Sequence, residues 1–142
     1  MRCLHALVLC LLAAVPARAE VLSGYWCGVA EQTNPDGAKS YWSANLLLKG
    51  AEGHMEYPSL DCGGPLTFER MENGIHFYRE RIAYGRDRCI DGGLVAVEQA
   101  GTSVRWEWTG SDVKASAVLS PNCPEKPGNA DLQYGRRRCS PA

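Results

Sequence analysis

Segments of strand length, each bounded by turn residues, recur at short intervals along residues 24–119 and constrain the fold more than any other feature of the sequence. Strand signals of this kind, with no convincing amphipathic helix between them, are typical of all-β domains. Asn34-Pro35-Asp36-Gly37 and Glu72-Asn73-Gly74 carry turn chemistry, and the second indicates a tight hairpin. We predict strands at residues 24–33, 40–49, 54–58, 66–71, 75–84, 94–99, 104–109 and 113–119.

The alternation within these strands indicates which side of the sheet is buried. Val104, Trp106 and Trp108 fall on one face of their strand, and Arg105 and Glu107 fall on the other. About eight strands joined by mostly short turns predict an antiparallel meander. Closing it into an up-and-down barrel removes the exposed edges of an open sheet. A two-sheet sandwich is the alternative.

The first 19 residues predict a secretory signal peptide. Met1-Arg2 supplies a positive charge, residues 4–15 are an apolar run, and Ala17-Arg18-Ala19 is a cleavage motif. The run is too short to cross a bilayer, and no later stretch approaches the roughly 20 apolar residues that a spanning helix needs. We expect a secreted or periplasmic protein without a membrane span, with a barrel domain at 20–119 and a proline-rich, cysteine-stapled tail at 120–142.

The charge balance argues against a nucleic-acid partner. Cleavage would remove Arg2 and Arg18, leaving 13 basic and 16 acidic side chains and a net charge of −3. Proteins that bind nucleic acids gain affinity chiefly by neutralising phosphates, which this balance does not favour.

Five cysteines would remain after cleavage, and an exported protein uses such residues for disulfides. Cys62 and Cys89 each precede a Gly-Gly turn, so we expect both to lie at one edge of the sheet and to pair. The second disulfide would join two of Cys27, Cys123 and Cys139, and all three pairings stay open. Because no spacing typical of metal ligands occurs, we expect structural cysteines, no metal and no cofactor.

Several motifs resemble a β-rich extracytoplasmic module of bacteria, which is found alone behind a signal peptide or attached to larger envelope or signalling proteins. The resemblance covers about residues 24–119 and implies no established activity. It rests on Tyr57-Pro58-Ser59-Leu60-Asp61-Cys62-Gly63-Gly64-Pro65-Leu66, on Arg79-Glu80-Arg81-Ile82, and on Gly85, Cys89 and Asp91-Gly92-Gly93.

Gly24-Tyr25-Trp26 is also similar to the Gly-x-Trp that opens lipocalin and avidin-type barrels. That likeness implies a small ligand in the barrel mouth if side chains leave the interior open. Size, export and fold class are similar to those of periplasmic lysozyme inhibitors, which is an analogy of fold alone.

The densest charge cluster and two tryptophans are the candidate binding residues. In a strand, Arg79 and Arg81 share one face while Glu80 takes the other, so Glu80 is expected to point inward and to need a partner such as an arginine. The alternative for Glu80 is a structural ion pair or a solvated strand end. The candidates for ligand or partner binding are Arg79, Glu80, Arg81, Arg86, Arg88, Trp106 and Trp108.

No motif in the sequence indicates a catalytic site. Ser59, Ser103, His54 and His76 have no spacing typical of a catalytic triad, and we expect both histidines to lie on the surface or in strand packing. The sequence therefore predicts a non-catalytic binding module for an unknown small ligand or envelope protein. The alternatives are an enzyme inhibitor, which would present residues 86–93 or 61–65, and an envelope hydrolase.

Overall fold

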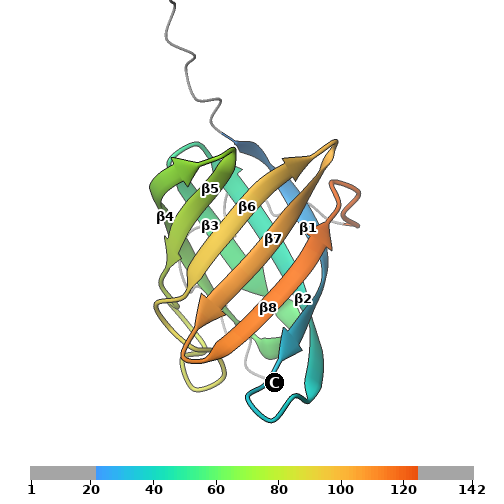
Figure 1. Cartoon of the computed structure of the whole chain (residues 1–142), viewed down its shortest axis with the longest axis vertical. Helices are drawn as coiled ribbons and strands as arrows, with labels where there is room; N and C mark the ends of the chain where they lie inside the picture. Colours follow the sequence, from blue (N-terminus) through green and yellow to red (C-terminus); the bar gives the residue numbers. More distant parts are fainter. Residues whose placement is uncertain (1–21, 125–142) are drawn as a thin grey trace, which may run out of the picture.

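The computed structural model describes residues 22–124, which form one closed sheet of antiparallel strands (Figure 1). Each strand pairs with the next along the chain, and the last returns to the first. This confirms the predicted meander and its closure, and excludes the two-sheet sandwich. The elements are β1 (Ser23–Thr33), β2 (Lys39–Lys49), β3 (Glu52–Tyr57), the 3-10 turn η1 (Pro58–Leu60), β4 (Cys62–Glu72), β5 (Ile75–Glu80), β6 (Leu94–Ala100), β7 (Ser103–Gly110) and β8 (Val113–Leu119).

The connections at the two ends of the barrel differ in length. At one end the strands are joined by tight turns, and at Asn73 and Gly74 both φ angles are positive, which confirms the predicted hairpin. The opposite end, at the bottom of Figure 1, carries the turn 34–38, η1 and residues 81–93. We call this opposite end the loop-bearing end.

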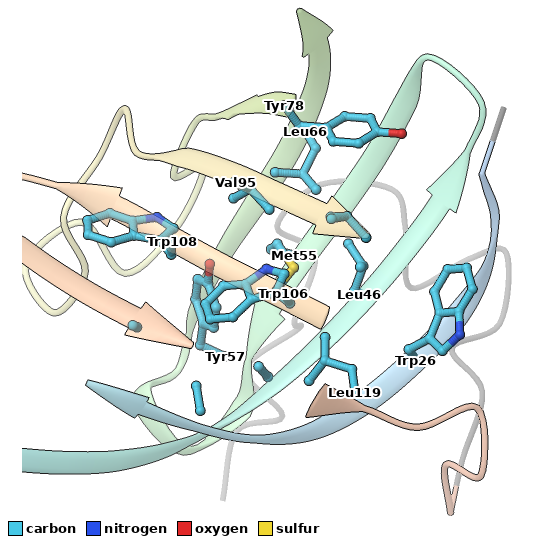
Figure 2. Packing of buried hydrophobic residues seen from close by; sticks show 14 of the residues in the cluster. Trp26, Leu46, Met55, Tyr57, Leu66, Tyr78, Val95, Trp106, Trp108 and Leu119 are labelled. Atoms are coloured by element: carbon cyan, nitrogen blue, oxygen red, sulfur yellow. The ribbon is translucent and has the colours of Figure 1, made fainter. Parts of the chain in front are cut away.

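Side chains fill most of the barrel interior (Figure 2). Val104, Trp106 and Trp108 point inward as the alternation predicts, while Arg105 and Glu107 are exposed. The interior of an eight-stranded barrel is just wide enough for side chains to fill, and large residues achieve this here. The labelled core residues in Figure 2 are Trp26, Leu46, Met55, Tyr57, Leu66, Tyr78, Val95, Trp106, Trp108 and Leu119.

The predicted turn at Cys62-Gly63-Gly64 is wrong, because these residues begin β4 and pair with β3. The chain reverses instead through η1 and Asp61, whose φ of 51° is left-handed. Gly64 permits a close approach: a Cβ there would overlap the backbone of residues 81–83. Glycine at this position thus allows residues 81–83 to pack directly against β4.

The strand predicted at 75–84 is shorter in the structure, where β5 ends at Glu80. After Glu80 the backbone leaves the β6 partner: the Arg81 N–H donates to Pro65 O at 3.1 Å, and the Ile82 N–H donates to the Asp91 carboxylate at 2.7 Å. Residues 81–93 therefore form a folded connection across the loop-bearing end.

The C-terminal end of the described chain lies beside β1. Glu31–Thr33 pair with β8, and Cys27 and Ser120 exchange two backbone hydrogen bonds of 2.9 Å. Cys27 forms its disulfide with Cys123, which selects one of the three open pairings. The predicted signal peptide, Cys139 and the rest of the tail lie outside the described residues.

Candidate functional site

One pocket of about 130 Å³ opens at the loop-bearing end, where β1, β2, β3, β5 and β7 bring side chains from separate parts of the chain together. The connection 81–93 supplies its outer wall. The lining includes Trp42, Tyr57, Glu80, Arg88, Ile90 and Trp108.

Glu80 is the buried acid of this pocket, with 1% of its surface exposed. It ends β5 on the inward face, one alternation after Tyr78, as the sequence predicts. The Tyr57 hydroxyl donates to Oε1 at 2.6 Å, and the Trp108 indole donates to Oε2 at 2.7 Å. The expected arginine partner is wrong, because two neutral donors hold the Glu80 carboxyl group. The alternatives, that Glu80 forms a structural ion pair or lies at a solvated strand end, are wrong for the same reason and because Glu80 is buried.

Burial raises the pKa of Glu80 to about 7, against an ordinary value of 4.5. The bonds from Tyr57 and Trp108 lower the pKa because they stabilise the carboxylate, but burial outweighs them. Asp91 raises the pKa further through repulsion, and His54 lowers it. Burial, followed by the Glu80 charge, raises the pKa of Tyr57 well above 10, so its hydroxyl stays a neutral donor.

Aromatic rings surround the acid. Trp42 meets Tyr57 edge to face, with ring centroids 4.9 Å apart, and meets Trp106 in the same manner at 5.8 Å. These contacts fix the Tyr57 ring beside Glu80. The buried Nε1 atoms of Trp42 and Trp106 have no hydrogen-bond partner among the described residues.

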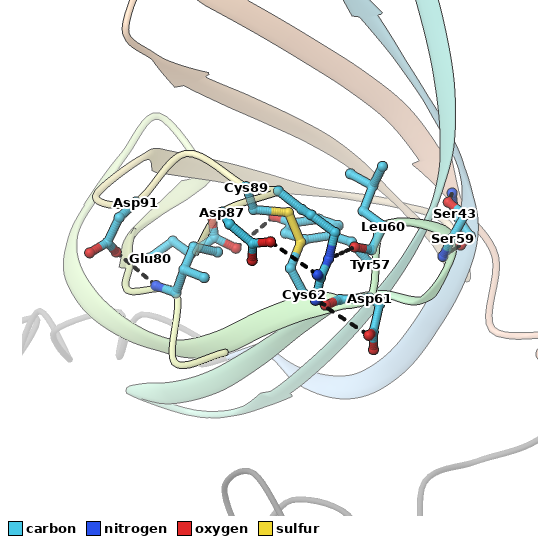
Figure 3. The surroundings of a disulfide bond; sticks show 12 residues. Ser43, Tyr57, Ser59, Leu60, Asp61, Cys62, Glu80, Asp87, Cys89 and Asp91 are labelled. Atoms are coloured by element: carbon cyan, nitrogen blue, oxygen red, sulfur yellow. Dashed lines mark hydrogen bonds and ion pairs between the residues drawn. A yellow bond between two sulfur atoms is a disulfide. The ribbon is translucent and has the colours of Figure 1, made fainter. Parts of the chain in front are cut away.

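The connection 81–93 is tied down at several points (Figure 3). Cys89 is joined to Cys62, which confirms the predicted disulfide. The Arg88 guanidinium donates to Leu60 O and Asp61 O, both at 2.9 Å. Together with the bond from Ile82 to Asp91, these contacts hold the outer wall of the pocket in one position.

The residues proposed for binding fall into four different environments. Arg86 donates to Ile82 O at 2.8 Å and Arg88 to the carbonyls of 60 and 61, so both guanidinium groups hold loop backbone. Trp106 is completely buried in the core, so its prediction as a ligand contact is wrong for this structure. Glu80 and Trp108 come together in the pocket.

Arg79 and Arg81 lie on the outer surface instead. They line a groove of about 730 Å³ across β2–β5, and Arg79 is paired with Glu69 at 2.8 Å. Lys49 and Glu52 also line this groove. Since charges of both signs are present, the groove does not select a ligand of either charge.

Three of the four residues weighed for catalysis lie in structural contacts, and the fourth, Ser103, begins β7 opposite Ala100. The Ser59 hydroxyl accepts from the Ser43 N–H, and the Ser43 hydroxyl accepts from the Ser59 N–H, both at 2.9 Å. His54 lies 3.5 Å from a Glu56 oxygen, and His76 is buried beside Phe68. The histidine environments agree with the predicted strand packing.

No protein family, curated protein or solved structure matches this chain. The likeness to a bacterial extracytoplasmic module therefore stays a prediction. Within residues 22–124, no helix is long and apolar enough to span a bilayer, and no acidic, histidine or cysteine cluster could hold a metal. The two disulfides are typical of a protein from an oxidising compartment.

Sequence reasoning missed Tyr57 and Trp42 as members of the site. Both carried a usable signal, since Tyr57 ends a strand immediately before Pro58 and Trp42 alternates with Ala44 and Leu46 on the inward face. Both side chains lie near Glu80 because of the way in which the strands of the closed barrel pair, which the sequence pattern does not show.

Proposed function

We propose that this protein is an exported, non-catalytic binding module that recognises a small ligand, or a side chain of an envelope protein, with the loop-bearing end of the barrel. The observation that carries the proposal is the pocket around Glu80. Core side chains occupy the rest of the interior, so the acidic pocket is where the barrel can accept a group from outside.

The N-terminal signal motif and the two disulfides support export. The resemblance to an extracytoplasmic module of bacteria supports the same location. A binding role is favoured over hydrolysis because Ser59 is engaged with the backbone of β2, and Glu80, which is held by Tyr57 and Trp108, is the one carboxylate among the described residues that line the pocket.

Native mass spectrometry of the protein isolated from its own envelope fraction tests this proposal. We expect the wild type to retain a small molecule or a bound protein. Ile90→Lys places a bulky positive charge at the pocket opening and should reduce the retained fraction several-fold. Val118→Lys is the matched control, because Val118 is an apolar, exposed residue on the outer face of β8.

A bare wild-type chain would contradict the binding proposal. Equal retention by Ile90→Lys and Val118→Lys would show that the target binds away from the pocket, which also contradicts it. Free-thiol counting in the same sample checks that both disulfides are intact.

An enzyme inhibitor is the second candidate, favoured by the way the connection 81–93 is held. The Cys62–Cys89 disulfide and the Arg88 bonds fix this segment, while Ile90 stays 40% exposed on it. A rigid protruding segment binds with little loss of conformational freedom. If a bound enzyme is recovered, Arg88→Ala should weaken its inhibition, and unchanged inhibition would argue against this segment.

A further inference from the structure

The Glu80 carboxyl group has unused capacity to accept hydrogen bonds. Each of its oxygens accepts one bond, from Tyr57 or from Trp108, and a carboxylate oxygen can accept two. The arginine that lines the pocket does not contact it, since Arg88 donates to Leu60 and Asp61. Within the described residues, the buried acid thus lacks a cationic partner.

The pocket walls also suit a cation. Trp42, Tyr57 and Trp108 line the pocket together with Glu80. The faces of such rings attract ammonium and guanidinium groups, and the attraction is stronger where water is excluded. A carboxylate enclosed by aromatic rings therefore favours a group that carries positive charge and N–H donors.

The charges beside the pocket are balanced apart from Glu80. Asp61, Asp87 and Asp91 lie on the segments that cover the pocket, against Arg81, Arg86 and Arg88. Arg88 stands close to carboxylates of both Asp61 and Asp87, at 3.3 and 3.2 Å. Once Glu80 is ionised, acidic groups outnumber basic ones at this end.

The size of the pocket limits what can enter. At about 130 Å³ it lies well below the roughly 300 Å³ at which pockets for drug-sized ligands begin. It has room for a group of a few non-hydrogen atoms, such as an alkylammonium or a guanidinium.

We infer that the group bound in this pocket is a small organic cation, an ammonium or guanidinium, held by the Glu80 carboxylate between the aromatic rings. This inference rests on the proposed function and names the chemistry of its target. The cation binds the ionised acid, so binding and protonation compete. With the pKa of Glu80 at about 7, the apparent affinity should be about tenfold weaker at pH 6 than at pH 8.

Several charged or titratable groups face Glu80 from the surrounding elements. Tyr57 stays neutral in this range. Asp91 and Arg88 on the connection 81–93 and His54 on β3 also face Glu80. Because these three groups are present in both proteins, the pH test compares the wild type with a variant in which only Glu80 is changed.

Titration of the mature, oxidised protein with methylguanidinium chloride tests the inference, with tryptophan indole N–H resonances as the readout and total chloride held constant. The neutral isostere N-methylurea is the comparison probe. We expect methylguanidinium to shift the Trp108 resonance with a millimolar dissociation constant, and N-methylurea to bind at least tenfold more weakly.

Glu80→Gln should weaken methylguanidinium binding at pH 8 at least tenfold and remove the pH dependence. The amide keeps the shape of the side chain, with an oxygen for the Trp108 donor and an NH₂ group for the Tyr57 oxygen. Glu107→Gln is the matched control, because Glu107 precedes Trp108 on β7 but is exposed on the outer face. It should bind as the wild type does.

Three results would overturn the inference: equal binding of N-methylurea, unchanged binding in Glu80→Gln, or no shift at about 100 mM methylguanidinium. The proposed function survives any of them if Ile90→Lys still reduces target retention relative to Val118→Lys. N-acetylarginine amide distinguishes the sources of the cation. Tighter binding than methylguanidinium identifies a protein side chain, and weaker binding identifies a free small cation.

Discussion

Glu80 is the residue at which burial and charge conflict most strongly. Its carboxyl group is enclosed in the barrel, yet the bonds from Tyr57 and Trp108 provide hydrogen bonds without a compensating charge. Transfer of an ionised group into such surroundings is costly unless a charge pairs with it. A residue that opposes stability in this way is typical of a functional position.

The raised pKa of Glu80 predicts that stability falls as pH rises. Between pH 4.5 and about 7 the folded protein keeps a proton that the unfolded chain releases. The contribution of Glu80 to the free energy of unfolding should therefore be highest below pH 4.5. It should decrease through this window by about 3 kcal/mol in total. Urea unfolding of the wild type and of Glu80→Gln at pH 5 and pH 7.5 measures the effect.

Only the difference between these two proteins isolates Glu80, because other groups titrate in both. The wild type should lose more stability than Glu80→Gln over this interval. Parallel profiles would show that the Glu80 pKa in the folded protein is close to its ordinary value.

At the scale of elements, the connection 81–93 has a structural role that its sequence does not indicate. Its charged residues suggest a solvated loop, but Arg86, Arg88 and Asp91 bond to backbone groups of the connection itself and of the η1 segment. Gly64 lets this segment pack against β4 without a Cβ between them. The loop thus becomes a wall of the pocket.

The two disulfides should contribute unequally to stability. Cys62 and Cys89 are 27 residues apart, whereas Cys27 and Cys123 are 96 apart. In the chain-entropy model, paired Cys→Ala changes should cost about 3–4 kcal/mol for the shorter loop and about 4–5 kcal/mol for the longer one. Urea midpoints of the two double variants measure this order.

A larger loss from the shorter loop would contradict the entropic explanation. It would show instead that Cys62–Cys89 supports native contacts of the connection 81–93. The retained affinity for methylguanidinium in that double variant would then report whether the pocket wall had moved.

At the scale of the whole molecule, the packed interior limits where a ligand could be accepted. Trp106 occupies the centre between Trp42 and Tyr57, so the described residues leave no open lumen of the sort that a lipocalin-type likeness implies. The proposed target could therefore contact only the end of the barrel or its outer surface.

Trp106→Ala should destabilise the barrel by about 3–5 kcal/mol, because it leaves a large cavity where several strands meet. Trp106→Phe should cost less, since the buried indole N–H has no partner among the described residues and its loss is no penalty. Val118→Ala, on the exposed face of β8, should stay within about 0.5 kcal/mol. Thermal unfolding of the three variants checks this order. Equal losses from Ala and Phe would contradict the cavity explanation.

Local sequence patterns correctly predict the strand content, the meander, the Asn73-Gly74 hairpin, the inward face of β7 and the inward direction of Glu80. These follow from alternation and turn chemistry, which act over a few neighbouring residues. The Cys62–Cys89 pairing was also predicted correctly, although Cys62-Gly63-Gly64 begins β4 and does not form the turn from which the pairing was inferred.

Three features could be found only from the folded structure. They are the partners of Glu80, the pairing of Cys27 with Cys123, and the structural roles of Arg86 and Arg88. Tyr57 and Trp108 are 23 and 28 residues from Glu80, and the register of a closed barrel is what brings them within hydrogen-bond distance. Barrel closure likewise places Ser120 beside Cys27. Contacts between distant segments depend on how all the strands pair at once, and no local pattern encodes that.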